Sequence, residues 1–526
     1  MVLERSRRDF LKHGSLLAAL ATVRPSWAQA RFVEAETAFG RVRGADADGI
    51  KTFKGIPYGA STAGKNRFMP PLDPVQWTGV RDALEFGRSA PQSEPGSQAA
   101  ASQFAVASAG LPAEGEDCLV LNVWTPAVGD GRKRPVMLWC HGGGFATGSG
   151  SSPGTDGTNL ARRGDAVVVS INHRLNVLGF THLGELGGAE LAQSGDVGML
   201  DIVHALKWVR ANIAQFGGDP NRVTVFGQSG GGRKVATLLA MPSAKGLFHR
   251  AIVESGATIK LVEREQAARV AGELVAKLGL AAKPRLSELQ TLPLERIMGA
   301  YFVTVRSMNV DPMTMGFSPT VDGTAVPRHP FHPTASDVSA DVPLIIGSTR
   351  TELTLQTDDA AFSLDEAGMR ARIGDLVGAA SGQVIDVYAK ANPRATASDL
   401  YFLIASDHRY GAPVMKIAER RAALGKGPVY LYYFRWETPL EGGRLKSPHT
   451  IEIPFVFDNV RSSRLTAGAP DAPALADKAS DAWIAFARAG DPNTPKLPHW
   501  PAFDAAARAT MVFDNVSVVA NDPLRE

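Results

Sequence analysis

The feature that most restricts the fold is a short segment, residues 223–239, that changes character at a glycine-rich turn. Val223-Thr224-Val225-Phe226 is rich in β-branched and aromatic residues and predicts a strand, whereas Lys234–Leu239 suits a helix. Between them stands Gly227-Gln228-Ser229-Gly230-Gly231, whose glycines permit a sharp reversal. A strand that enters a helix through such a turn is typical of an α/β sheet, and it lifts the serine hydroxyl clear of the sheet.

Other segments repeat this alternation of strand and helix. Short apolar runs predict further strands that are buried on both faces of a parallel sheet, namely residues 136–139, 166–171 and 343–346. Apolar residues at helical spacing occupy residues 199–213, and this predicted helix ends before Gly217-Gly218. We therefore expect an open, mostly parallel sheet with helices on both faces, in one domain over residues 29–526. Segments at about 260–335 and 360–425 are predicted to be helical insertions that cap the sheet.

The G-x-S-x-G pattern around Ser229 is weak evidence alone, because Gly150-Ser151-Ser152-Pro153-Gly154 matches it too. Ser152 has no predicted strand before it and is followed by a proline, so we interpret it as a loop serine. The simpler interpretation of Ser229 is an incidental hydroxyl in a glycine-rich turn. Its position between a strand and a helix favours a nucleophile instead.

A second glycine cluster, His141-Gly142-Gly143-Gly144-Phe145, follows the strand predicted at residues 136–139. Glycines there allow several backbone N–H groups to turn toward one point, as donors for an oxyanion must. A flexible loop or a general anion-binding nest would have the same composition. A phosphate loop is excluded because no Gly-Lys-Ser/Thr follows.

Several motifs together resemble the type-B carboxylesterases of the α/β-hydrolase fold, the family of bacterial para-nitrobenzyl esterases and animal cholinesterases. One signature is Glu116–Val123, and the other is Phe216-Gly217-Gly218-Asp219-Pro220 with the elbow around Ser229 at the right spacing. The N-terminal stretch matches through Phe53–Tyr58, Arg67-Phe68, Pro70-Pro71 and Trp77–Asp82. The resemblance runs from about Phe39 to near Phe513.

The resemblance implies a set of site residues. By matching the family order of nucleophile, acid and base, it assigns Ser229 as nucleophile, Glu352 as acid and His449 as base. Glu352 follows the strand predicted at 343–346, and His449 lies in a loop after residues 429–434. The same matching assigns the oxyanion donors to the N–H groups of three glycines, Gly143, Gly144 and Gly230.

Three positions depart from the family pattern. Gln228 stands where many relatives carry Glu, which removes a negative charge and makes a cationic substrate less expected. Thr351-Glu352-Leu353 replaces the commoner Asp-Glu-Gly. The Pro- and Ser-rich segment 89–110, predicted to be a surface loop, contains Phe104 but no Trp and no cysteine that could pair with Cys118. An aromatic cage for a quaternary ammonium group is therefore not expected.

The chain has only two cysteines, Cys118 and Cys140, which excludes a disulfide framework and a multi-cysteine zinc site. We expect both to be unpaired, and no cofactor or metal is predicted. Cys140 beside His141 is an alternative nucleophile, but a thiol at the buried end of a strand is more often a packed core residue.

The N-terminus resembles a twin-arginine export signal. Arg7-Arg8 precedes an apolar run, Leu16–Val23, which is followed by small residues typical of a cleavage site. We predict a signal peptide over residues 1–28, with cleavage after Ala28 or Ala30. The run is too short to span a bilayer; the alternative is an amphipathic helix of the fold. We expect a periplasmic or secreted protein that meets the export machinery through this signal.

The net charge of +3 belongs wholly to this N-terminal segment, and the remainder is formally neutral. The charge therefore gives no argument for a nucleic-acid partner, and no later apolar stretch reaches spanning length. We predict a serine carboxylester hydrolase that acts through an acyl-enzyme on small, uncharged esters. Two alternatives stay open: the same site could cleave amides, carbamates or lactones, or the fold could serve a catalytically silent binding protein. Such a binding protein would be expected to lack Ser229, Glu352 or His449.

Overall fold

A computed structural model describes residues 31–95, 112–310 and 316–523. The predicted export signal, residues 1–28, and part of the loop predicted at 89–110 lie outside the described residues. The strands are β1 (Arg31–Thr37), β2 (Gly40–Ala47), β3 (Ile50–Pro57), β4 (Val80–Asp82), β5 (Val120–Thr125), β6 (Arg134–Cys140), β7 (Val167–Ile171), β8 (Gly218–Gln228), β9 (Arg250–Glu254), β10 (Leu344–Thr349), β11 (Val429–Phe434), β12 (Ala509–Phe513) and β13 (Val518–Asn521).

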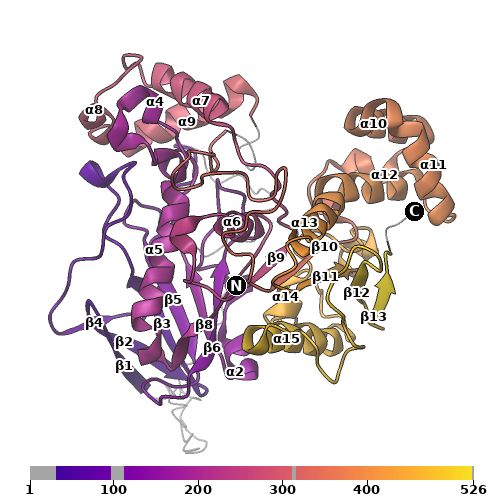
Figure 1. Cartoon of the computed structure of the whole chain (residues 1–526), viewed down its shortest axis with the longest axis horizontal. Helices are drawn as coiled ribbons and strands as arrows, with labels where there is room; N and C mark the ends of the chain where they lie inside the picture. Colours follow the sequence, from indigo (N-terminus) through magenta and orange to yellow (C-terminus); the bar gives the residue numbers. More distant parts are fainter. Residues whose placement is uncertain (1–30, 96–111, 311–315, 524–526) are drawn as a thin grey trace, which may run out of the picture.

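The described strands form one sheet in the order β1-β2-β3-β5-β7-β6-β8-β9-β10-β11-β12-β13, with β4 paired to β2. Every pairing from β7 through β6, β8, β9, β10 and β11 to β12 is parallel. The pairings from β1 to β7 and that of β12 with β13 are antiparallel, and the short β4 pairs with β2 in parallel. Figure 1 shows this sheet running through the centre of the molecule. The expectation of a mostly parallel central sheet is confirmed.

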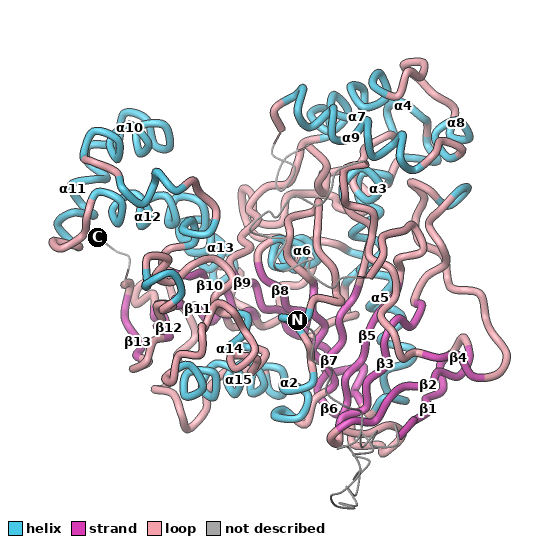
Figure 2. The backbone as a smooth tube through the Cα atoms, turned by 180° about the vertical axis from the view of Figure 1, so that it is seen from behind, coloured by secondary structure: helices cyan, strands magenta, loops and turns pink. Residues whose placement is uncertain are grey.

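Helices cover both faces of the sheet, as Figure 2 shows from behind. They are α2 (Thr158–Gly164), α3 (Asn176–Gly179), α4 (Gly184–Gly187), α5 (Val197–Asn212), α6 (Gly230–Leu238), α7 (Arg264–Lys277), α8 (Leu286–Gln290), α9 (Leu294–Met308), α10 (Glu366–Val377), α11 (Ser381–Ala391), α12 (Ala397–Ser406), α13 (Ala412–Ala422), α14 (Ile453–Val456) and α15 (Ala472–Ala489). The helix expected at 199–213 is α5, which continues as a 3₁₀ turn and ends at Gly217, where φ is +76°.

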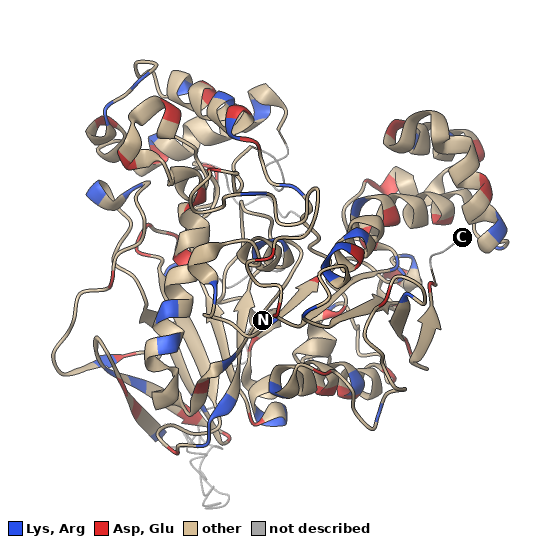
Figure 3. Ribbon diagram, in the orientation of Figure 1, with Lys and Arg blue, Asp and Glu red and all other residues tan. Residues whose placement is uncertain are grey.

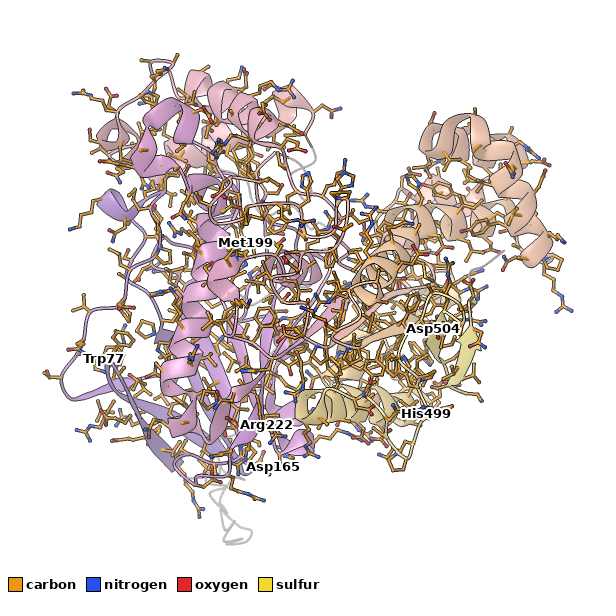
Figure 4. The ribbon with its side chains drawn as sticks, viewed as in Figure 1. Trp77, Asp165, Met199, Arg222, His499 and Asp504 are labelled. Carbon is orange, nitrogen blue, oxygen red and sulfur yellow. The ribbon has the colours of Figure 1, made fainter. Side chains whose placement is uncertain are left out.

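The two faces of the sheet have separate cores because side chains alternate along each strand. In β6, Val136 and Leu138 pack with α5 and α6, and Met199 of α5, labelled in Figure 4, is fully buried in this cluster. Met137 and Trp139 pack with α2 and α15 on the opposite face. Near-continuous apolar runs are therefore required in the central strands, as the sequence pattern indicated.

Two groups of helices lie at the upper left and upper right of Figure 1. Helices α7, α8 and α9 lie within residues 260–335 and share the core that contains α5 and α6, and α10 to α13 lie within 360–425. In the second group, α10, α11 and α12 have a small core of their own, which includes Ile373 and Phe402, whereas α13 packs in the same core as α5. Both groups are inserted between strands, the first between β9 and β10 and the second between β10 and β11.

Charged residues of both signs are spread over the helices and the outer strands, as Figure 3 shows. Among the described residues, no helix is long and apolar enough to cross a lipid bilayer.

Candidate active site

Ser229 lies at the sharp turn between β8 and α6. Its backbone adopts φ 57° and ψ −122°, a conformation that costs a non-glycine residue about 1–3 kcal/mol. The turn is held by a hydrogen bond from the Ser229 N–H to the Glu254 carbonyl, 2.8 Å away. Glycine is required around it: a Cβ on Gly231 would lie 1.9 Å from the Cys140 carbonyl oxygen. The local geometry is that of a nucleophile elbow.

The second glycine cluster packs directly against this turn. Gly143 and Gly144 have φ of +89° and +61°, and a Cβ on Gly230 would lie 2.3 Å from the Gly144 nitrogen. A Cβ on Gly142 would lie 3.6 Å from Ser229 Cβ. The N–H groups of Gly143, Gly144 and Gly230 donate no hydrogen bond to any described residue. Three donors without protein partners therefore lie beside the serine, as a hole for an oxyanion requires.

Glu352 and His449 form a buried pair. Glu352 follows β10 at the start of a 3₁₀ helix, and its Oε1 accepts a hydrogen bond from the Thr349 N–H at 2.8 Å. Its Oε2 lies 2.5 Å from Nδ1 of His449. The side chains are 0% and 3% exposed, so the contact is shielded from solvent. With Nδ1 directed at the carboxylate, Nε2 is the nitrogen left to accept a proton.

A clamp between two loops fixes the position of His449. The Thr351 N–H donates to the Ser447 carbonyl at 3.0 Å, and the Ser447 N–H donates to Thr351 Oγ1 at 2.8 Å. The Ser447 hydroxyl also donates to the Phe434 carbonyl at 2.9 Å. The residue that the sequence marked only as a departure, Thr351, thus ties the histidine loop to the Glu352 turn.

Gln228 connects the serine turn to the histidine. Its Nε2 lies 3.3 Å from Nδ1 and 3.4 Å from Nε2 of His449, so the amide faces the ring and is not aligned with either nitrogen. Within the described residues no hydrogen bond joins the Ser229 hydroxyl to the ring. In ligand-free enzymes such bonds commonly tighten only when substrate binds.

Comparisons with known proteins identify the family. The profile of the carboxylesterase family matches residues 29–524. The chain belongs to this family. The para-nitrobenzyl esterase of Bacillus subtilis (strain 168) is 35% identical over 497 residues, which cover 93% of this chain and 96% of that relative. The phenmedipham hydrolase of Pseudarthrobacter oxydans is 37% identical over 512 residues, covering 93% and 97%.

Solved structures show the same fold. A carboxylesterase of Geobacillus stearothermophilus superposes with a TM-score of 0.80 at 38% identity, covering 94% of this chain and 98% of the other. A para-nitrobenzyl esterase structure gives a TM-score of 0.79 at 33% identity, with coverage of 94% and 98%. The protein is a carboxylesterase, a hydrolase of the α/β-hydrolase fold.

In this carboxylesterase an aromatic residue from the second helical insertion packs on the histidine. A π-helical turn, η10 (Asp407–Gly411), joins α12 to α13 and carries Tyr410. The Tyr410 ring lies 5.0 Å from the His449 ring between centroids, at an interplanar angle of 39°. Its hydroxyl donates to Gln356 Oε1 at 3.1 Å. This contact depends on the fold and was not predicted from the sequence.

Two further carboxyls are buried near the pair. Burial raises the pKa of Glu254 to about 8, although the Trp483 indole N–H donates to it at 2.7 Å. Burial is the main cause that raises the pKa of Glu452, and the charges of Glu352 and Glu254 add to it. Oε1 of Glu452 accepts a hydrogen bond from the Ser255 hydroxyl at 3.0 Å. Glu254 is therefore mainly neutral at pH 7, and the raised pKa of Glu452 also favours its neutral form, which limits the accumulation of negative charge around Glu352.

The rival nucleophiles have unsuitable surroundings. Ser152 lies in a loop before a short 3₁₀ helix, without a preceding strand. Cys140 and Cys118 are both buried and unpaired, and burial raises the pKa of Cys140 to about 12, so its thiolate is scarce at neutral pH. Within residues 31–95, 112–310 and 316–523, no group of three or more His, Cys, Asp or Glu residues could hold a metal ion.

Proposed function

We propose that this carboxylesterase hydrolyses uncharged carboxylic esters through an acyl-enzyme on Ser229, with His449 as general base and Glu352 as its partner. The observation that carries the proposal is that three features lie together at the carboxyl ends of the parallel strands. These are the strained serine turn, the buried pair at 2.5 Å, and three backbone N–H groups that have no partner in the part of the chain that the structure describes. Ester hydrolysis itself follows from the family.

In the first half-reaction, Ser229 Oγ bonds to the ester carbonyl carbon while its proton passes to His449 Nε2. The carbonyl oxygen becomes an oxyanion, which the N–H groups of Gly143, Gly144 and Gly230 stabilise. Glu352 orients the ring and stabilises its charged form. The C–O bond to the alcohol then breaks, and the alcohol leaves with the proton from Nε2.

In the second half-reaction, water replaces the alcohol. His449 Nε2 accepts a proton from the water as its oxygen attacks the acyl carbon, and the oxyanion forms again in the same hole. The bond to Ser229 Oγ breaks, and the serine recovers its proton from Nε2. The products are a carboxylic acid and free enzyme. Each proton taken by the histidine is returned, so no cofactor is needed.

The preference for a neutral substrate rests on Gln228. This residue is buried, faces His449 and carries no charge, so a cationic alcohol group would find no carboxylate at this position. The buried Glu254 and Glu452 do not replace that charge, because their pKa values are raised.

The decisive experiment compares Ser229→Ala with Ser152→Ala on a panel of para-nitrophenyl esters, amides and carbamates. We expect Ser229→Ala to lose at least about 10³-fold in kcat, and Ser152→Ala, the serine of the other G-x-S-x-G match, to retain wild-type turnover. A fluorophosphonate should label Ser229 alone, as peptide mass mapping would show. Full ester turnover in Ser229→Ala would overturn the mechanism, and faster cleavage of amides or carbamates would change the substrate class.

We further propose that the N-terminal segment directs export. The support is sequence alone: Arg7-Arg8, the short apolar run and the small residues before Ala28 and Ala30. Arg7→Lys with Arg8→Lys keeps the charge but removes the arginine pair. We expect this double variant to keep its esterase activity inside the cell and to lose it from the periplasmic or secreted fraction. An unchanged distribution would contradict the proposal.

A further inference from the structure

A buried lysine lies behind the glycine cluster His141–Phe145, which we call the oxyanion loop. Lys234 is on α6, five residues after Ser229, and its side chain is completely buried. Lysine is almost never fully buried without a charged partner. Here no carboxylate of a described residue lies within ion-pair distance, and the hydrogen bond that Nζ makes is to the His141 carbonyl at 2.8 Å. The buried ammonium group therefore donates its hydrogen bond to the first residue of the oxyanion loop.

The surroundings of Lys234 come from three elements, and none offers a negative charge. On the loop after β6, His141 stacks on His173, which follows β7, at 5.0 Å between ring centroids and 14°. Phe145 presents its ring 5.9 Å from Nζ, and Cys140 ends β6. Burial is the main cause that lowers the pKa of both histidines, and the charge of Lys234 is the second. Burial also raises the pKa of the Cys140 thiol. The facing groups are neutral at pH 7.

The position of the bond links it to the oxyanion donors. The His141 carbonyl precedes Gly142, Gly143 and Gly144, the segment that packs against Ser229 and Gly230. We propose that Lys234 is a positioning residue for acyl transfer: its ammonium holds the His141 carbonyl so that the N–H groups of Gly143 and Gly144 face the oxyanion. This inference rests on the proposed function of Ser229. A charge-assisted hydrogen bond is shorter and stronger than a neutral one, so the protonated lysine holds the loop more firmly.

A pH dependence follows from the burial of the amine. Burial lowers the pKa of Lys234 to about 7, with a smaller opposing effect of Cys140. The lysine is charged below that pH and neutral above it. We expect kcat to decline as pH rises through this range, while KM changes little, because the loop acts mainly on the transition state.

The experiment uses Lys234→Met and Lys234→Gln, with Thr237→Val as a control on the same helix. We expect kcat of Lys234→Met to fall about tenfold, less than the loss of an oxyanion donor itself would cost, and its pH profile to lack the decline above pH 7. Lys234→Gln keeps a neutral hydrogen-bond donor, so its kcat should lie between those of wild type and Lys234→Met. Removal of an unpaired buried charge should raise the Tm of Lys234→Met. Thr237→Val removes a buried hydroxyl whose hydrogen bond, among the described residues, is to the Arg233 carbonyl of the same helix, so its kcat and pH profile should stay as in wild type.

A merely structural role predicts the opposite pattern. Lower Tm or failure to fold in both lysine variants, or unchanged kcat with an unchanged pH profile, would overturn the inference. Fluorophosphonate labelling of Ser229 in the same variants separates the two proposals. If Ser229 is labelled and the lysine variants behave as wild type, only the role of Lys234 fails; if Ser229→Ala keeps its turnover, the mechanism on which it rests fails.

Discussion

Tyr410 packs against His449 although the two residues come from different parts of the fold. The tyrosine lies on a π-helical turn of the second helical insertion, and the histidine on the loop after β11, with ring centroids 5.0 Å apart. Single-turn π bulges within helices are often found at functional sites. The insertion thus supplies a wall for the imidazole, and rotation of the ring away from Glu352 is opposed by packing as well as by the hydrogen bond.

We therefore predict that Tyr410→Ala lowers kcat about tenfold, because a small misplacement of a reacting group already costs one to two orders of magnitude. Tyr410→Phe keeps the ring and loses only the hydrogen bond to Gln356, so kcat should stay within about threefold. Steady-state kinetics on a para-nitrophenyl ester, with Tm measured in parallel, provides the test. Equal losses in the two variants would show that the hydroxyl of Tyr410, and not the packing of its ring, matters for kcat.

The clamp between Thr351 and Ser447 can be tested with a matched pair of serines. Ser447 and Ser480 are both fully buried, and each donates its hydroxyl to a backbone carbonyl, Phe434 and Phe455 respectively. Ser→Ala at either site should destabilise the fold by about 0.5–1.5 kcal/mol in urea unfolding, since each removes one buried hydrogen bond. The Phe434 carbonyl still accepts the Arg350 N–H at 3.0 Å. Only Ser447→Ala should also lower kcat, because it alone borders His449. A similar decrease in Ser480→Ala would contradict this.

Gly230 and Gly144 lie so close together that adding one methyl group at Gly230 should lower kcat strongly. Gly230→Ala would place a Cβ 2.3 Å from the Gly144 nitrogen, so the loop must move away from the oxyanion position. We expect kcat to fall about 10²–10³-fold, the cost of losing an oxyanion donor. Gly299→Ala, in α9, meets no atom within 4 Å and serves as the control; it should leave kcat unchanged and stabilise the helix by about 0.5–1 kcal/mol.

Glu254 makes stability depend on pH. Its folded pKa, about 8, is raised above the ordinary value of 4.5, so the folded protein binds more protons between these two pH values. The stabilisation is complete below pH 4.5 and is lost as pH rises through about 8. Glu254→Gln removes this titration and keeps an acceptor for Trp483, so the Tm of the variant relative to wild type should rise from pH 6 to about pH 8 and then level off towards pH 9. A constant Tm difference over that range would exclude a raised pKa at this position.

The local signals of the sequence predicted the elbow, the alternation of strands and helices, and the residues of the site by resemblance. The turn at Ser229 was predictable because a strand, three glycines and a helix start leave few conformations available. The sequence could not predict the clamp of Thr351 with Ser447, the packing of Tyr410 against His449, or the carbonyl that accepts the hydrogen bond of Lys234. Each of these contacts joins segments brought together only by the sheet order. A lysine in an otherwise helix-compatible run gives no sign that its amine is buried.

The sheet order also leaves one edge of β11 open during synthesis. The neighbour of β11 is β12, residues 509–513, and the Phe513 carbonyl accepts the Arg435 N–H just beyond β11. A growing chain emerges from its amino end, so the strand that leads to His449 stays unpaired on this side until residues 509–513 have been made. Such an edge readily recruits other chains. A chain that stops before β12 would therefore expose an aggregation-prone edge next to the loop that carries His449.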